Sequence, residues 1–112
     1  MSVARYHHVH TSRINLAIHL LAVPIFDVTG FVTIVALARG RFTSAGLLAL
    51  APLVSLAVQG IGHRLERNPP EPFRGPLDAV RRILLEQYYT FPLFVFTGAW
   101  LRAWRAAPRQ AA

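Results

Sequence analysis

The residues best able to do chemistry are three histidines in two separate parts of the chain. His10 and His19 flank the start of one long apolar run, and His63 lies near the end of another. Imidazole and carboxylate side chains suit iron, zinc or manganese. The chain contains no cysteine, which excludes disulfides, thiolate-ligated iron–sulfur clusters and a cysteine nucleophile. Any metal in this protein must therefore be held by histidine, aspartate or glutamate.

Polar residues accompany the histidines at helical spacing. Gln59, His63 and Glu66 stand at positions i, i+4 and i+7, so an amide, an imidazole and a carboxylate share one helical face. An open set of histidine and carboxylate ligands is what iron(II) uses to activate dioxygen. Glu66 is accordingly a candidate fourth ligand. The candidate supporting groups around the metal are Asn15, Gln59 and Glu86.

Three apolar runs must position these groups. They cover about residues 14–38, 44–66 and 77–104, between a polar N-terminal segment 1–13 and a basic tail 105–112. At about 1.5 Å rise per residue, each run is long enough to cross a hydrocarbon core roughly 30 Å thick. If each crosses once, the polar groups meet at or just below one membrane face. These groups are His10, His19, His63, Glu66 and Glu86.

Prolines interrupt the first and third runs. Pro24 either kinks the first run or divides it into a re-entrant pair of shorter helices, and the sequence leaves both open. The third run contains Pro92 between two pairs of aromatic residues, about 24 Å apart along a helix, which is typical of interfacial belts. These pairs are Tyr88 with Tyr89, and Trp100 with Trp104. The predicted fold is an all-α integral membrane helical bundle of three to four apolar helices, forming one domain over residues 1–112.

The composition also indicates a membrane protein. Hydrophobic residues make up 54% of the chain and charged residues 15%, whereas a soluble domain has about 25% charged residues. The net charge of +7 comes from twelve arginines and no lysine against five acidic residues. Because the arginines bracket the apolar runs, we interpret them as headgroup anchors and expect no nucleic-acid partner.

A structure without a metal fits the same residues. His19 can bond Asn15 inside a bundle, and His63 can cap its helix. Glu86 can pair with Arg82 one turn away. The protein would then be a non-catalytic membrane protein that packs against a partner through small residues, namely Gly46, Ala49, Gly60 and Gly62. Spacing alone leaves both interpretations open, because no histidine pair here has a motif as sharp as H-E-x-x-H.

Two histidine blocks and a loop form a recognisable pattern. The first block is His10, Asn15, His19 and Pro24, the second is Gln59, Gly62, His63 and Glu66, and a proline-rich loop runs through Phe73 to Pro76 and Leu77. This pattern resembles the Mpo-type 2-hydroxy fatty acid dioxygenases, a family of small multi-span membrane proteins. The resemblance covers roughly residues 6–100 and implies an iron(II)-dependent, dioxygen-consuming α-oxidation that shortens a 2-hydroxy fatty acid by one carbon. It also implies that His10, His19 and His63 hold the iron.

Two positions depart from the family pattern. The family places its glutamate three intervening residues after the second-block histidine, whereas only two separate His63 from Glu66. Ala22 stands where the family favours glycine, which could narrow or reshape the pocket. The resemblance implies a lipid-like substrate with a carboxylate, and an arginine near the mouth of the site would attract that group. The candidates are Arg64, Arg81 and Arg82.

Overall fold

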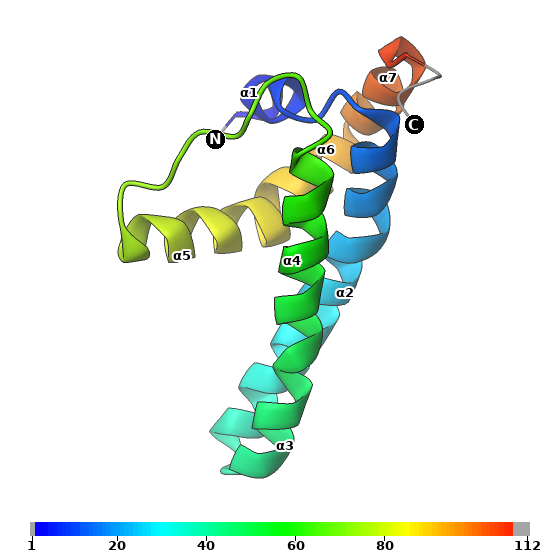
Figure 1. Cartoon of the computed structure of the whole chain (residues 1–112). Helices are drawn as coiled ribbons and strands as arrows, with labels where there is room; N and C mark the ends of the chain where they lie inside the picture. The colour runs from blue at the N-terminus through cyan, green and yellow to red at the C-terminus, as the bar shows by residue number, and fades with distance from the viewer. Residues whose placement is uncertain (1, 109–112) are drawn as a thin grey trace.

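The computed structural model describes residues 2–108, and every regular element among them is helical. The all-α prediction is therefore confirmed. In chain order (Figure 1) the elements are α1 (Val3–His8), α2 (Arg13–Ala38), α3 (Phe42–Leu48), α4 (Leu50–His63), α5 (Pro76–Leu85), the π-helical turn η1 (Glu86–Thr90), α6 (Phe91–Phe96) and α7 (Ala99–Ala106).

A long antiparallel hairpin of α2 against α3 and α4 forms the spine of the molecule (Figure 1). The turn between its arms closes α2 with a pair of backbone bonds, from Gly40 N to Leu37 O at 3.0 Å and from Arg41 N to Ala36 O at 2.9 Å. This is the Schellman arrangement, which needs a left-handed residue after the helix. Gly40 supplies it with a φ of 72°. Arg39, Gly40 and Arg41 thus form a tight basic turn between the two arms.

Helix α2 continues past Pro24 as a single helix. The interpretation in which Pro24 divides this run into a re-entrant pair is therefore wrong. Near the proline, the Ser55 hydroxyl of α4 donates a hydrogen bond of 2.6 Å to the Ala22 carbonyl of α2. A cross-link of this kind helps hold a proline-containing helix in place, because proline removes one of the helix's own hydrogen bonds.

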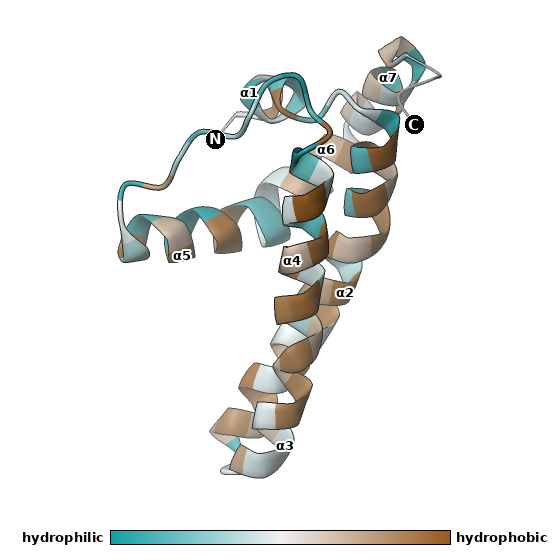
Figure 2. Ribbon diagram, viewed as in Figure 1, coloured by the Kyte–Doolittle hydropathy of each residue, from teal (hydrophilic) through white to brown (hydrophobic). Residues whose placement is uncertain are grey.

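The two arms of the hairpin, Arg13–Ala38 and Phe42–His63, are long and apolar enough to cross a membrane by length and composition. Only 22% and 28% of the residues in their most apolar stretches are buried inside the protein. Apolar residues recur along both arms (Figure 2), and many of the large ones are exposed. A break at Ala49 between α3 and α4 precedes Pro52, which has no N–H to offer the Leu48 carbonyl.

The third apolar run does not form the single span that its length predicts. Among the described residues only the two hairpin arms are long and apolar enough to cross a membrane. Helix α5 projects to one side of the hairpin (Figure 1), and η1 and α6 continue it behind α4. Gly98 then adopts a left-handed φ of 82° and starts α7 in a new direction. The basic tail begins inside the end of α7, and residues 109–112 lie outside the described part.

The apolar residues of this third segment build the protein's own core. That core lies at the histidine end of the hairpin, where Trp100 Nε1 also donates to the Leu16 carbonyl at 3.0 Å. Trp100 thus packs against α2, and Trp104 stacks on Trp100. The core residues are Tyr6 of α1, Leu16 and Val23 of α2, Phe91 and Phe94 of α6, and Ala99 and Ala103 of α7.

Candidate metal centre

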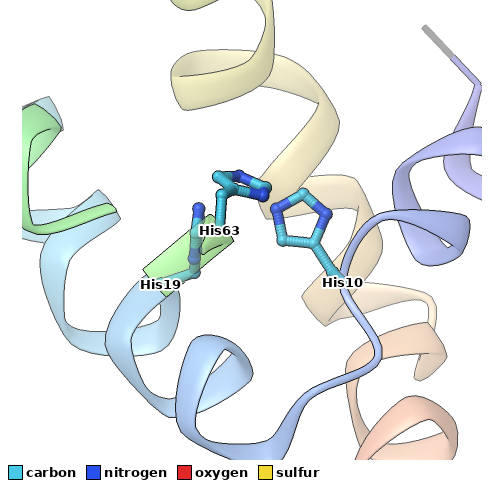
Figure 3. A group of neighbouring side chains, drawn as sticks. All are labelled: His10, His19 and His63. Atoms are coloured by element: carbon cyan, nitrogen blue, oxygen red, sulfur yellow. The ribbon is translucent and has the colours of Figure 1, made fainter. Parts of the chain in front are cut away.

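The three predicted histidines converge on one point. His10 follows α1, His19 lies in the second turn of α2, and His63 is the last residue of α4. Each offers a ring nitrogen, and these nitrogens lie within 4.8 Å of one another. The ring centroids are 4.6 to 4.9 Å apart in edge-to-face contacts. Figure 3 shows the three rings facing a common centre from three separate elements.

Backbone carbonyls fix the tautomers of two of these rings. His10 Nδ1 lies 2.6 Å from Tyr6 O, and His19 Nδ1 lies 3.0 Å from Asn15 O. A carbonyl only accepts hydrogen bonds, so both Nδ1 atoms must carry the hydrogen, which leaves Nε2 with its lone pair free. Burial, reinforced by the two neighbouring imidazoles, lowers the pKa of His10 well below its usual value. Its ring is therefore neutral at physiological pH, the form that binds metals.

This donor set fits a metal ion. Three atoms at the maximum spacing of 4.8 Å would each lie about 2.8 Å from their common centre, against roughly 2.0–2.1 Å for a metal–imidazole bond. A shift of less than about 1 Å per ring therefore brings all three into bonding distance. His63 Nδ1 is buried without a hydrogen-bond partner among residues 2–108. An unpaired buried nitrogen costs free energy and calls for an explanation, such as a bound ion near the ring.

The alternative interpretation of these histidines receives mixed support. His19 does bond the backbone of Asn15, as that interpretation expects, but through the ring nitrogen that a ligand does not need. The three rings face one another. The metal interpretation requires this arrangement, whereas the alternative interpretation has them pointing apart or paired locally. No carboxylate belongs to the group of ligand atoms found among the described residues.

Glu66 holds the start of α2 instead of facing this group. Its two carboxylate oxygens accept hydrogen bonds from Thr11 N at 2.7 Å, Ser12 N at 3.0 Å and Asn15 Nδ2 at 2.6 Å. A carboxylate at a helix N-terminus satisfies otherwise unpaired N–H groups and complements the positive end of the helix dipole. The idea that Glu66 is a fourth ligand does not agree with this position, because its hydrogen-bonding capacity is already taken up.

Two of the expected supporting residues, Asn15 and Gln59, lie on the same helices as His19 and His63. The backbone carbonyl of Asn15 accepts a hydrogen bond from His19 Nδ1, and its side-chain amide donates one to Glu66. Gln59 exchanges two hydrogen bonds with Gln87 of η1, at 3.1 Å and 2.7 Å. This buried amide pair ties α4 to the π turn, and π turns often mark functional sites. Sequence reasoning missed Gln87, although a lone amide in an otherwise apolar run was a usable signal.

Glu86, the third expected supporting residue, contacts an arginine. Its Oε1 lies 4.0 Å from Arg82 Nη2, as the alternative interpretation predicted. Burial raises the pKa of the Glu86 carboxyl, and the nearby Arg82 charge opposes that shift. Within residues 2–108, no hydrogen bond joins Glu86 to a histidine. Glu86 and the three histidines line the same cavity.

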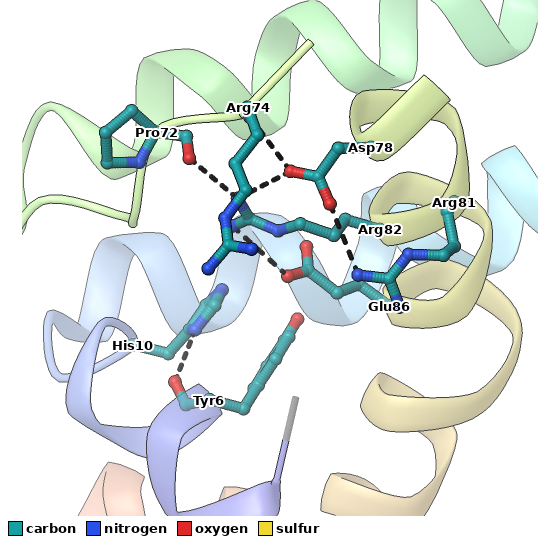
Figure 4. Close-up of polar contacts among 8 residues, drawn as sticks. All are labelled: Tyr6, His10, Pro72, Arg74, Asp78, Arg81, Arg82 and Glu86. Atoms are coloured by element: carbon teal, nitrogen blue, oxygen red, sulfur yellow. Dashed lines mark hydrogen bonds and ion pairs between the residues drawn. The ribbon is translucent and has the colours of Figure 1, made fainter. Parts of the chain in front are cut away.

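A cavity of about 320 Å³ opens onto the histidines. Glu86, Gln87 and the loop residues 70–73 form much of its wall. Arg82 is the one candidate carboxylate-binding arginine that lines it; its side chain is only 13% exposed. Arg82 also donates to Pro72 O at 3.1 Å and lies over the Phe73 ring at 4.7 Å, so it fastens the loop to α5 (Figure 4).

The other two candidate arginines lie outside this wall. Arg64 is exposed at the end of α4. Arg81 is paired with Asp78 at 3.2 Å and lines a smaller neighbouring pocket with Arg5 and Arg74. The structure thus separates Arg82, which borders the histidine cavity, from Arg64 and Arg81, which do not.

Comparison with known proteins agrees with this site. A family model described as 2-hydroxy-palmitic acid dioxygenase Mpo1-like matches residues 2–84, well over half of the chain. The matched region contains all three histidines. No curated protein and no solved structure matches the chain. By this match the protein belongs to the family described as 2-hydroxy-palmitic acid dioxygenase Mpo1-like.

Proposed function

We propose that the protein is an iron(II)-dependent dioxygenase that shortens 2-hydroxy fatty acids by one carbon. The observation that carries the proposal is the cluster of three imidazoles, with two tautomers fixed so that free nitrogens face a cavity. The family description supports the reaction and the class of substrate. In this proposal the iron ligands are His10, His19 and His63.

The proposal places the hairpin in a membrane. Its two arms have the length and composition of spans, and their apolar side chains face outward. Helix α5 supports the same placement, because it projects sideways from the hairpin and leaves Leu77, Val80 and Leu84 exposed by 87%, 56% and 46%. These three positions share one helical face, which suits a helix lying in the membrane interface. The histidine cavity would then open near the headgroups.

The residues around the cavity fit the two ends of a 2-hydroxy fatty acid. Arg82 provides a positive charge at the wall for the carboxylate. Leu56, Phe73 and Ile83 line the same cavity and suit the first part of an acyl chain. Bound iron(II) would supply the redox chemistry by which dioxygen reacts with the substrate. The hydrogen bonds of His10 and His19 hold the rings in the orientation that binding requires.

Metal content is the direct test. The full chain is purified in detergent, loaded anaerobically with iron(II) and compared with His63→Ala and with His8→Ala. His8 is the matched control, because it is exposed and lies outside the cluster. We expect about one iron per chain in the wild type and in His8→Ala, and loss of iron in His63→Ala.

Oxygen uptake then tests the reaction. The iron-loaded wild type should consume dioxygen with 2-hydroxyhexadecanoate and release a product one carbon shorter, detectable by mass spectrometry. Hexadecanoate, which lacks the 2-hydroxyl, should give no uptake. Failure of the wild type to bind iron under reducing conditions would reject the dioxygenase proposal and favour the non-catalytic membrane protein.

A further inference from the structure

Tyr6 supports His10 in two ways. Its ring stacks on the His10 ring, with centroids 3.8 Å apart and planes 7° from parallel, and its carbonyl accepts the His10 Nδ1 hydrogen at 2.6 Å. The residue is only 1% exposed and packs against Phe91 and Phe94 in the core. A phenylalanine could make all of these contacts. The phenolic hydroxyl therefore needs a separate explanation.

No hydrogen bond joins that hydroxyl to another residue among residues 2–108, although Tyr6 belongs to the core. A tyrosine in a protein core usually hydrogen-bonds through this group, so the donor of Tyr6 is free for a ligand. Tyr6 lines the histidine cavity, and Figure 4 shows its hydroxyl pointing toward Glu86, with no bond between them. A tyrosine hydroxyl keeps its proton at neutral pH, so this group is an O–H donor on a residue that lines the cavity beside the histidines.

We propose that the Tyr6 hydroxyl donates a hydrogen bond to the oxygen-bearing head of the fatty acid bound in this cavity, and so helps to select and orient it. This inference rests on the proposed function. The accepting oxygen belongs to the carboxylate or to the 2-hydroxyl, since both are held at the same end of the ligand. The stacked His10 ring keeps the donor next to the ligand nitrogens.

Tyr6→Phe isolates the hydroxyl, because it keeps the ring that stacks on His10. The matched control is Tyr89→Phe, since Tyr89 is 54% exposed and does not line the cavity. Both variants and the wild type are prepared as full chains in detergent and loaded anaerobically with iron(II). The measurements are iron per chain, thermal unfolding, and calorimetric Kd for 2-hydroxyhexadecanoate and for hexadecanoate.

We expect Tyr6→Phe to keep its iron and its unfolding temperature while its Kd for 2-hydroxyhexadecanoate rises. The rise should be about three- to tenfold if the lost bond is to the 2-hydroxyl and about tenfold or more if it is to the carboxylate, because a hydrogen bond to a charged group is stronger. A matching rise for hexadecanoate assigns the bond to the carboxylate, and an unchanged value assigns it to the 2-hydroxyl. Tyr89→Phe should behave as the wild type.

A Kd within about twofold of the wild type would overturn the inference. So would loss of iron or of thermal stability in Tyr6→Phe, because the hydroxyl would then have a structural role. If the wild type binds no iron, the proposed function fails, and the same Kd comparison on the metal-free proteins decides the role of the hydroxyl by itself. A wild type that binds neither fatty acid would overturn the inference as well.

Discussion

Gly62 is the position at which the contact between the two hairpin arms is most sensitive to one added carbon. A Cβ there would fall within 3.0 Å of Asn15 Oδ1, which no real pair of such atoms tolerates, and would lie 3.2 Å from Asn15 Cγ and 3.4 Å from Ile18 Cδ1. Asn15 cannot simply turn away, because its amide donates to Glu66 at 2.6 Å. Gly62→Ala must therefore break that hydrogen bond or push α4 away from α2.

Each of these responses has a known scale. Breaking a hydrogen bond to a charged group costs about 1.5–3 kcal/mol, and separating packed elements costs about 1–3 kcal/mol. Gly60→Ala is the matched control, since a Cβ at Gly60 meets nothing within 4 Å. Both substitutions gain similar helix propensity, up to about 1 kcal/mol. We therefore expect Gly62→Ala to be about 1–3 kcal/mol less stable than Gly60→Ala.

The consequence for the site follows from the neighbouring residues. His63 is next to Gly62, and the Asn15 carbonyl holds His19. A displacement of either changes the spacing of the ligand nitrogens, and such changes around a metal typically cost 10–100-fold in metal affinity. Thermal unfolding in detergent and iron(II) titration measure the two effects. For a chain of this size, 1 kcal/mol corresponds to roughly 4 °C in Tm.

A double-mutant cycle tests the stated cause. In an Asn15→Ala background the clashing atoms are absent, so the added cost of Gly62→Ala should largely disappear. The reasoning is refuted if Gly62→Ala is as stable and binds iron as tightly as Gly60→Ala. An undiminished cost in the Asn15→Ala background would equally show that the contact is not the cause.

Two further predictions concern the carboxylates near the site. Glu66→Gln should lower the free energy of unfolding by about 1–3 kcal/mol, because the charged acceptor at the start of α2 is lost, yet keep one iron per chain at saturating iron; lost iron with unchanged stability would instead make Glu66 a ligand. Glu86→Gln concerns pH. Burial raises the folded pKa of Glu86 above its ordinary 4.5, so the wild type loses stability as pH rises above that value, and the metal-free variant should gain on it between about pH 4 and pH 7. Denaturant unfolding of the metal-free variant and the metal-free wild type at about pH 4 and pH 7 checks this. A stability difference that does not shift in favour of the variant between the two pH values would contradict it.

The third apolar run shows where sequence reasoning failed. Its hydrophobic residues and paired aromatics predict a span, but Phe91 and Phe94 pack against Tyr6 and Leu16 in the core. Hydropathy measures how apolar a segment is and does not say whether protein or lipid will cover it. The reversal at Gly98 depends on a positive φ, and the sequence does not reveal which of its glycines adopts one.

Glu66 shows a second kind of limit. Helical periodicity predicts that His63 and Glu66 share one helical face, but α4 ends at His63, so Glu66 lies beyond the helix. Periodicity also does not determine which partner each side chain meets. The N–H groups of Thr11 and Ser12 need an acceptor where α2 begins. They lie 55 and 54 residues away from Glu66 along the chain, so only the packing of the two arms brings them within reach.

The sequence by itself determined the helical class, the two long apolar arms and the identity of the three clustered histidines. It could do so because apolar run length and turn residues are local properties, and because two antiparallel arms necessarily return His63 to the level of His19. The tertiary structure alone decided the path of α5 to α7, the cap that Glu66 makes on α2 and the Tyr6 ring that supports His10. These features depend on contacts between distant segments, whose energies are set by shape and by unsatisfied hydrogen-bonding groups that no local pattern records.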